Sequence, residues 1–424
     1  FQYDMSGKMV GKIEKDEDGK SMNSTRWLYS LEKGKNGLLD KVVSTNSHQI
    51  DYVYDDKLRL VAKKEEVCGR CYSYSYTYDA ANRLSSITYP SGLCISKSYS
   101  NSGYEKEISD AVDNKVLWRT NNTDAYGRVV DYDLGDGTNT IISYDAQTSL
   151  MDNIVVSNEK DVIQHYSYSY DGLGNMTSRV KKNGMRMEEE FEYDDFDRLV
   201  GATLNGVETV RMLYDKQGNV LEKKVDDVGV LYAASYDTER PNVILRAKTD
   251  DERMFAGFSQ NMKYSSFDNL VNVSNSDDYA DIGYGCDNSR IYMKTQVDGV
   301  VKTKTYVDEC ELVEEDGKEY ANTFVSGPDG IFAICAIDDD GNKSYNFVHK
   351  DNLSSWNLIA DENGKIVVEM RLVNDVEEEA TLIEDEDFGI DDDDKKSETE
   401  ESDLDLFGQE TSVEVQLSEI ENLK

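Results

Sequence analysis

The chain has 424 residues, of which 38% are hydrophobic, and its 85 acidic against 46 basic residues give a formal net charge of −39. So acidic a chain excludes nucleic-acid binding as its main function, because that function needs a basic face against the phosphates. No run of about 18 apolar residues is present, which excludes a membrane-spanning helix. The 28 tyrosines and three prolines favour β-sheet, since tyrosine suits half-buried strands and proline removes a ladder hydrogen bond.

A short pattern recurs from the first residues onward. It consists of an aromatic or apolar residue, any residue, Tyr-Asp, two variable residues, then Gly, Asn or Asp, then Arg, Asn or Lys, and an apolar residue. Clear copies are FQYDMSGKMV at 1–10, YTYDAANRLSSI at 76–87 and FEYDDFDRLV at 191–200. The residues assigned to this repeat signature are Tyr3, Asp4, Tyr54, Asp55, Tyr78, Asp79, Arg83, Tyr170, Asp171, Gly174, Tyr193, Asp194, Arg198, Tyr214, Asp215 and Gly218.

One copy of the pattern predicts one β-hairpin. In 76–87 the entering strand places Tyr76 and Tyr78 on one face. Asp79 then leaves the strand, because its carboxylate can accept bonds from nearby turn amides. A Gly, Asn or Asp follows that tolerates a left-handed backbone, and Arg83 begins the return strand. Between copies lie second turns, which are strong hairpin signals: Asn183-Gly184, Asn205-Gly206, Asp298-Gly299, Asp316-Gly317, Asp340-Gly341 and Asn363-Gly364.

Tandem hairpins of this kind predict an all-β fold. A single hairpin cannot bury its own apolar face, so neighbouring hairpins must pair side by side into one long antiparallel sheet.

These copies resemble the YD repeats of Rhs proteins, wall-associated bacterial toxins, the C components of insecticidal toxin complexes and animal teneurins. The resemblance covers roughly residues 1–370. It implies a long, curved sheet that spirals into a hollow shell around a C-terminal toxic polypeptide, and we expect this chain to form a partial or degenerate shell wall and not a complete capsule.

The segment 324–373 resembles the Rhs-associated core. Its signature includes a histidine, an aspartate, a leucine, a serine and a later Asp with a Gly three residues on. The matching residues are Gly327, Pro328, Gly330, His349, Asp351, Leu353, Ser355, Asp361 and Gly364, whereas Lys350, Asn352, Ser354 and Ala360 depart from the pattern. Self-cleavage in this family is associated with Asp-Pro motifs, and this chain contains no Asp-Pro dipeptide; autoproteolysis is therefore not expected.

The organisation expected from these patterns is a repeat array at 1–323, the core-like segment at 324–373 and an acidic tail at 374–424. The tail holds 21 acids against three lysines, which is −18 of the total charge. Such a composition favours disorder. No toxin domain is recognisable in it, which leaves three alternatives: a degenerate or toxin-less member, a shell whose effector lies elsewhere, or a tail that binds a basic partner. Because the chain begins within a repeat and without Met, we expect it to be a piece of a longer protein.

Few residues point to metal or redox chemistry. The six cysteines are scattered, which favours free thiols over disulfides. Cys68 and Cys71 have C-x-x-C spacing, but a zinc site would need further ligands, and a hairpin turn is the favoured interpretation. Asp338–Asn342 and Asp391–Asp394 could suggest calcium, but counting from Asp338 or Asp340 the twelfth position of an EF-hand loop is His349 or Asp351 and not Glu, which leaves weak surface binding as the alternative. We therefore expect no metal site and no cofactor.

A catalytic function is not expected. His349 lies near Asp351 and Asp361 in sequence, but a structural role is favoured over an acid–base pair. The ladder Tyr72, Tyr74, Tyr76 and Tyr78 could bind sugars, although packing within the sheet is the favoured reading.

The function predicted is a structural shell or scaffold of a secreted or cell-surface bacterial protein of the polymorphic-toxin type. The partners it implies are an enclosed C-terminal toxin or a secretion-apparatus component. The alternative is a binding module that recognises a glycan or a cell-surface receptor through Tyr-rich sheet faces.

Overall fold

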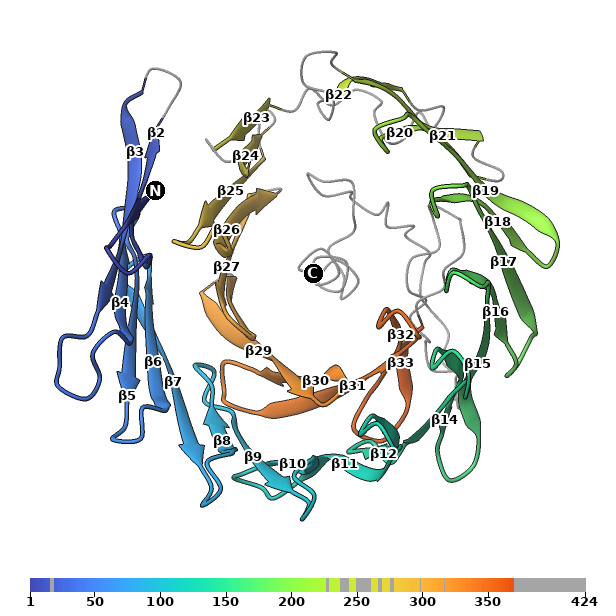
Figure 1. Cartoon of the computed structure of the whole chain (residues 1–424), viewed down its shortest axis with the longest axis horizontal. Helices are drawn as coiled ribbons and strands as arrows, with labels where there is room; N and C mark the ends of the chain where they lie inside the picture. The colour runs from blue at the N-terminus through green and yellow to red at the C-terminus, as the bar shows by residue number, and fades with distance from the viewer. Residues whose placement is uncertain are drawn as a thin grey trace, which may run out of the picture. The chain divides into compact units, whose positions relative to one another are not determined.

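The computed structural model describes residues 1–369 except 16–18, 226–228, 237–243, 249–260, 266–268, 275–277, 298 and 316. The predicted acidic tail at 374–424, with its calcium candidate Asp391–Asp394, lies outside the described residues, as do the first residues of two predicted second turns, Asp298 and Asp316. The described residues form strands and turns and contain no helix (Figure 1), which confirms the all-β prediction. It follows that no helix among them could cross a membrane.

The described strands belong to two antiparallel sheets in which strands adjacent in the chain pair with each other, and among these strands the first and last of a sheet do not pair. The first sheet contains β1 (Gln2–Tyr3), β2 (Met9–Lys15), β3 (Ser21–Tyr29), β4 (Leu39–Ser44), β5 (His48–Tyr54), β6 (Leu60–Val67), β7 (Arg70–Tyr78), β8 (Leu84–Thr88), β9 (Cys94–Tyr99), β10 (Glu105–Asp110), β11 (Val116–Thr123), β12 (Val129–Leu134), β13 (Asn139–Tyr144), β14 (Met151–Ser157), β15 (Val162–Tyr170), β16 (Met176–Lys181), β17 (Met187–Tyr193), β18 (Leu199–Leu204), β19 (Val207–Tyr214), β20 (Val220–Val225), β21 (Gly229–Tyr236) and β22 (Ile244–Lys248).

The second sheet contains β23 (Asn261–Tyr264), β24 (Leu270–Ser274), β25 (Tyr279–Tyr284), β26 (Arg290–Val297), β27 (Val300–Val307), β28 (Cys310–Glu315), β29 (Lys318–Gly327), β30 (Gly330–Ile337), β31 (Lys343–Lys350), β32 (Trp356–Ala360) and β33 (Ile366–Glu369).

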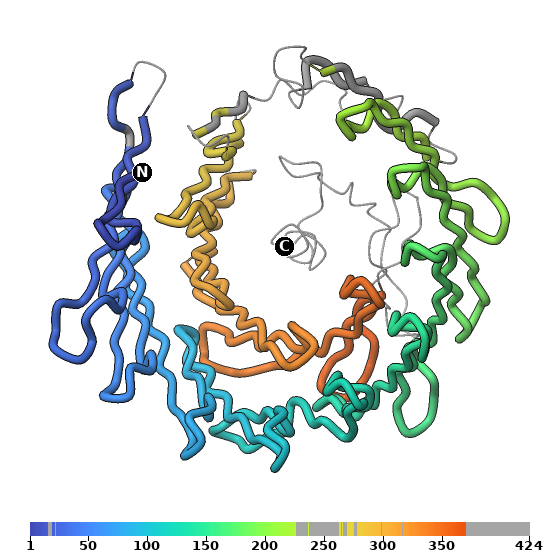
Figure 2. Tube along the Cα trace, viewed as in Figure 1, coloured from blue at the N-terminus to red at the C-terminus, as the bar shows by residue number. Residues whose placement is uncertain are grey.

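The chain divides into two compact units, each built from both sheets. Unit 1 comprises Phe1–Arg119 and Ser259–Asn346, and unit 2 comprises Thr120–Phe258 and Phe347–Lys424. Figure 2 shows how the trace in each unit proceeds as one hairpin after another. Each unit therefore brings together segments that are far apart in sequence.

Side chains alternate along the strands as the pattern predicts. In β7, Tyr74 is buried while Ser73 and Ser75 are exposed. The buried face of the first sheet in unit 1 packs against the second sheet, where the rings of Trp118 and Phe332 lie 5.2 Å apart. The core of each unit is therefore a layer between two sheets.

The second turns are tight two-residue connections. Asn205 and Gly206 join β18 to β19 with φ angles of 51° and 81°, values that Asn and Gly accept more readily than other residues. Cys68 and Gly69 join β6 to β7 in the same way, with φ angles of 50° and 81°. The C-x-x-C motif therefore forms a hairpin turn, as predicted.

Gly283 of β25 offers a direct test of the packing between strands. It pairs with Tyr292 of β26, and a Cβ at position 283 would lie 2.0 Å from the Tyr292 ring. We predict that Gly283→Ala lowers the free energy of unfolding by about 1–3 kcal/mol, because the ring must leave its position. Urea denaturation followed by circular dichroism measures the change.

The matched control is Gly172→Ala, because a Cβ there meets no atom within 4 Å. An equal effect of both substitutions would contradict the predicted clash at position 283.

Candidate functional site

The Tyr-Asp turn is held by its aspartate. The Oδ1 atom of Asp79 accepts hydrogen bonds from the backbone N–H groups of Ala81 and Arg83 at 2.8 and 2.9 Å. Its Oδ2 atom accepts a 2.7 Å bond from Nε of Arg83. Asn82 has a φ angle of 64° and donates its N–H to the carbonyl of Asp79. One carboxylate thus closes the backbone turn and fixes the side chain that starts the return strand.

The same arrangement recurs along both sheets. In each copy one carboxylate oxygen accepts the N–H groups two and four residues later. Besides Asp79, the residues in this role are Asp4, Asp55, Asp124, Asp171, Asp194, Asp215, Asp338, Asp351 and Asp361. We call this arrangement the aspartate clasp.

The clasp explains several residues of the predicted core signature. Asp351 and Asp361 hold clasps of their own, while Ser355 donates the N–H at the fourth position. Gly364 has a φ angle of 74° at the third position, as Gly174 and Gly218 have in the repeats. The core segment thus continues the repeat geometry, a signal already present in its Asp-x-x-(Gly or Ser) spacing.

In most copies the tyrosine of the Tyr-Asp pair joins its hairpin to the preceding one. The hydroxyl of Tyr78 donates a 2.7 Å hydrogen bond to the carbonyl of Leu60, and the guanidinium of Arg59 lies 4.5 Å from the centre of the Tyr78 ring. In other Tyr-Asp pairs the same hydroxyl-to-carbonyl bond links Tyr54 to Leu39, Tyr193 to Met176, Tyr214 to Leu199 and Tyr236 to Val220. Tyr99 and Tyr284, which are followed by Ser and Gly, make the same bond to Leu84 and Leu270. The Tyr-Asp dipeptide therefore combines a contact between hairpins with a contact within one.

Two tyrosines of the signature differ from this pattern. Tyr3 lies in β1 and is 61% exposed. The hydroxyl of Tyr170 accepts a 3.1 Å bond from Nδ2 of Asn352, and therefore binds the second sheet of unit 2.

The two sheets of unit 1 are joined by buried polar groups. Tyr74 is 1% exposed, and its hydroxyl donates to the carbonyl of Val307 at 2.7 Å while it accepts the N–H of Glu309 at 3.2 Å. Asp110 accepts bonds from Nζ of Lys343 and from the hydroxyl of Tyr345, and these two donors, against the cost of burial, lower the Asp110 pKa to about 2.

His48 is the centre of a second polar contact in unit 1. Its Nδ1 atom accepts the N–H of Cys286 at 3.2 Å, and its Nε2 atom lies 2.9 Å from Oε1 of Glu65. The other oxygen of Glu65 lies 2.9 Å from Nζ of Lys63. Burial alone would raise the pKa of Glu65, but His48 and Lys63 outweigh it and lower that pKa. Sequence analysis missed this group because its members are up to 238 residues apart.

Unit 2 contains the remaining core-signature residues. His349 is 1% exposed, and its Nε2 atom lies 3.3 Å from Oδ2 of Asp136. Asp351 bonds Nη1 of Arg179 at 3.1 Å, in addition to its clasp. The side chain of His349 faces Asp136 and not Asp351 or Asp361; Asp351 bonds Arg179, and Asp361 accepts the N–H of Lys365 within its own turn.

The other core-signature residues have distinct positions. Gly327 and Gly330 pair with each other across the turn that contains Pro328, and a Cβ on Gly327 would approach Phe332 and Ile108. Leu353 is 64% exposed at the tip of its clasp.

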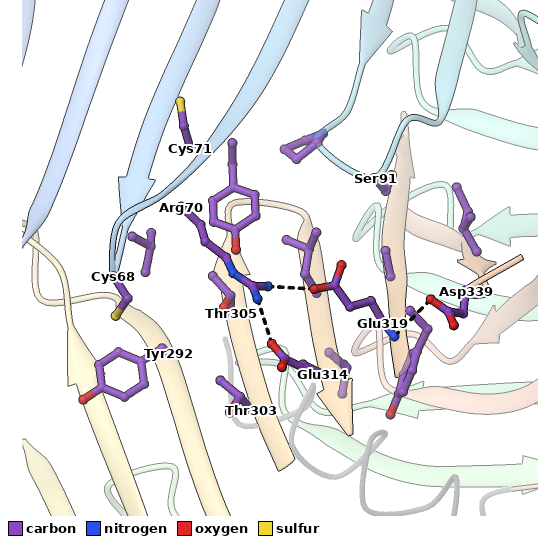
Figure 3. Close-up of a pocket in the computed structure, with 18 of the residues that line it drawn as sticks. Cys68, Arg70, Cys71, Ser91, Tyr292, Thr303, Thr305, Glu314, Glu319 and Asp339 are labelled. Atoms are coloured by element: carbon purple, nitrogen blue, oxygen red, sulfur yellow. Dashed lines mark hydrogen bonds and ion pairs between the residues drawn. The ribbon is translucent and has the colours of Figure 1, made fainter. Parts of the chain in front are cut away.

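A cleft of about 750 Å³ opens in unit 1 between the β6–β7 turn and strands of the second sheet. Arg70 spans it and bonds Glu314 at 2.9 Å and Glu319 at 3.0 Å (Figure 3). Tyr72 and Tyr292 also line it. These aromatic rings and charged groups suit a ligand with several hydroxyl groups.

Cys68 and Cys71 lie at this cleft, but Figure 3 shows their side chains pointing away from each other, an orientation unsuited to shared metal binding. All six cysteines are free thiols, as predicted, and three of them, Cys286, Cys310 and Cys335, are buried. The calcium candidate Asp338 uses its carboxylate in a clasp. In the described part of the chain, His, Cys, Asp and Glu side chains form no group of three that could hold a metal ion.

Comparison with known proteins agrees with this geometry. The family model described as RHS Repeat matches residues 54–93, which cover the clasps of Asp55 and Asp79. Residues 54–93 are an RHS repeat. No curated protein matches the chain.

Solved structures extend the likeness from this RHS repeat to most of the fold. A crystal structure of TcdB2–TccC3–Cdc42 matches 87% of this chain with a TM-score of 0.70 at 16% identity. A crystal structure of TcdB2–TccC3 matches 85% with a TM-score of 0.65 at 15% identity. The Photorhabdus luminescens Tc holotoxin pore matches 85% with a TM-score of 0.65 at 14% identity. The predicted resemblance to Rhs-type YD-repeat proteins is thereby confirmed, and this chain spans 22–24% of the length of those chains.

The contact between hairpins is testable at Tyr214. We predict that Tyr214→Phe lowers the free energy of unfolding by about 0.5–1.5 kcal/mol, because the carbonyl of Leu199 loses its donor. The control is Tyr126→Phe, since Tyr126 is 78% exposed. Urea denaturation of both variants measures the difference, and equal stabilities would contradict the role given to the Tyr214 hydroxyl.

The clasps predict sensitivity to acid. Hydrogen bonds from the side chain of Arg198 and from the turn amides lower the pKa of Asp194. Hydrogen bonds within their turns also lower the pKa values of Asp79 and Asp215. A lowered folded-state pKa gives stability that is present above the ordinary Asp pKa and is lost as the pH falls through the folded value. We expect the urea midpoint to fall steeply below about pH 4.

The variant Asp194→Ala lacks one of these carboxylates, so its urea midpoint should fall less steeply than that of the unmodified chain as the pH is lowered. An identical pH profile for the variant and the unmodified chain would contradict this assignment.

Proposed function

We propose that the chain is a wall segment of an Rhs-type shell that encloses a toxic polypeptide. The observation that carries the proposal is the match of 87% of the chain to the TcdB2–TccC3–Cdc42 structure with a TM-score of 0.70. The RHS repeat at residues 54–93 supports it independently of the structural comparison. The comparisons support an Rhs-type scaffold, and we propose in addition that this scaffold encloses a toxin.

The physical properties of the chain suit a wall. Each clasp fixes its own turn and most tyrosines of the signature bind the preceding hairpin, so hairpins can be added in series. The net charge of −39 keeps a large sheet protein soluble and discourages association through sheet edges.

The proposed partners follow from this role. They are a C-terminal toxin enclosed by the complete shell or a component of a secretion apparatus, and the proposed location is outside the cell or at its surface. The name of one matching structure, a Tc holotoxin pore, supports that setting. We also propose the sequence-based organisation, with an array at 1–323, a core-like segment at 324–373 and an acidic tail at 374–424.

Catalysis is not part of the proposal. His349, the residue considered for acid–base chemistry, is 1% exposed, so its ring is out of reach of a substrate in this structure. Hydrolase and nuclease assays of the chain and of His349→Ala test this point directly.

The shell proposal predicts a particle of defined form. Electron microscopy of the full-length parent protein should show a hollow particle with density for the C-terminal region inside. A protease added to the native particle should leave that region intact, whereas the same protease in urea should degrade it. A solid globule, an extended rod or an accessible C-terminal region would contradict the proposal.

A binding module is the second candidate function, and the cleft at Arg70 favours it. The Tyr72–Tyr78 ladder itself is used largely for packing, since Tyr74 is buried and stacks on Tyr76 with ring centres 6.1 Å apart. Binding to a glycan would therefore use the cleft residues Tyr72 and Tyr292.

On a glycan array this alternative predicts binding that is lost in a Tyr72→Ala, Tyr292→Ala variant. The control is Tyr126→Ala, which removes an exposed ring that does not line the cleft. Equal binding by all three proteins, or none by the unmodified chain, would remove the alternative.

A further inference from the structure

Lys12 is a buried lysine whose amino group contacts the side-chain amide of a residue 276 positions later in the sequence. It lies in β2, and its side chain is 7% exposed. Its Nζ atom is 3.2 Å from Oδ1 of Asn288 and 3.3 Å from the carbonyl oxygen of Cys286. The same Nζ atom lies 3.1 Å from Oε1 of Glu14. An amine, a carboxamide and a carboxylate therefore meet between the two sheets of unit 1.

The position of Asn288 is fixed by its turn. The turn begins at Gly285, whose carbonyl accepts the N–H of Asn288 at 3.2 Å, and Asn288 itself has a φ angle of 69°. Cys286 in this turn is held from both sides, because His48 accepts its N–H and Lys12 donates to its carbonyl. Fixing both reactants in this way lowers the entropic cost of a reaction between them.

The surroundings are partly apolar. Cys286 forms a buried cluster with Val42 and Ile50, against which Trp27, Leu39 and Tyr52 pack. Glu14 is 14% exposed, and Nδ2 of Asn23 lies 3.5 Å from its Oε1. The carboxylate of Glu14 lies beside Nζ of Lys12 and can accept a proton from it, which leaves the amine, the form that acts as a nucleophile.

We propose that Lys12 and Asn288 form an intramolecular isopeptide bond that joins the two sheets of unit 1 covalently. A rotation of the Asn288 side chain presents its Cγ atom to Nζ of Lys12. Glu14 accepts a proton from the ammonium group, Nζ attacks Cγ, and the C–N bond to Nδ2 breaks. Glu14 returns that proton to the leaving nitrogen, and the second proton that Nζ loses on forming the amide passes through Glu14 to the same nitrogen. Lysine ammonium and carboxamide thus give a secondary amide and one ammonium ion, without an oxidant or a co-reactant.

Other lysines between these sheets have different partners. Lys63 lies between Glu65 and Asp308, and these two carboxylates, against the effect of burial, raise its pKa and keep it charged. Lys343 bonds the carboxylates of Asp110 and Asp113. Lys12 is distinguished from both by its contact with a side-chain amide, which releases ammonia when a bond forms.

Intact-mass spectrometry of the denatured full chain tests the proposal. The expected mass is about 17 Da below that of the sequence, the mass of one ammonia. Proteolysis should yield a branched peptide in which the segment containing Lys12 is linked to the segment containing Asn288. An unshifted mass would overturn the proposal, as would a loss confined to a succinimide at an Asn-Gly pair without a branched peptide.

Variants assign the roles. Lys12→Arg, Asn288→Ala and Glu14→Gln should each restore the full mass, the last because it removes the proton shuttle while keeping the shape of the side chain. Lys63→Arg is the matched control, because Lys63 also lies between the two sheets of unit 1 but contacts other residues. This variant should still show the loss of ammonia. Retention of the branched peptide in Glu14→Gln would contradict the role given to Glu14.

Discussion

The aspartate clasp is the interaction on which the rest of the fold depends. A turn that exposes several backbone N–H groups is unfavourable unless they find acceptors. One carboxylate satisfies two of these groups in a turn such as that of Asp79, and its second oxygen orients Arg83. The arginine of one hairpin then lies beside the tyrosine ring of the next, as Arg83 does 4.4 Å from the Tyr99 ring. A local turn is thereby coupled to the pairing between hairpins.

The clasp does not determine how the second sheet packs on the first. That contact is made by buried polar groups with specific partners, such as Tyr74 with Val307 in unit 1 and Arg179 with Asp351 in unit 2. A buried donor or acceptor without a partner is costly, so these pairs favour one alignment of the sheets over others. The hairpins therefore form the sheets, and the buried polar pairs determine how the second sheet is aligned on the first within each unit.

The sequence predicts the hairpins well because their causes are local. Asp79, Asn82 and Arg83 lie within five residues, and their geometry follows from turn chemistry. The partners of His48 could not be predicted, since Cys286 is 238 residues away and neither residue carries a pattern of its own. His349 was recognised as part of a signature, but its neighbour Asp136 belongs to a turn without any resemblance to that signature.

Hydrogen exchange in the Asp194→Ala variant tests most directly whether one clasp supports its neighbour. The account predicts faster exchange at the amides of Phe196 and Arg198, which lose their acceptor, and also in β19 and β20. The second effect is expected because Arg198 lies 4.6 Å from the Tyr214 ring. Faster exchange confined to the altered turn, with β19 and β20 unchanged, would contradict the coupling between hairpins.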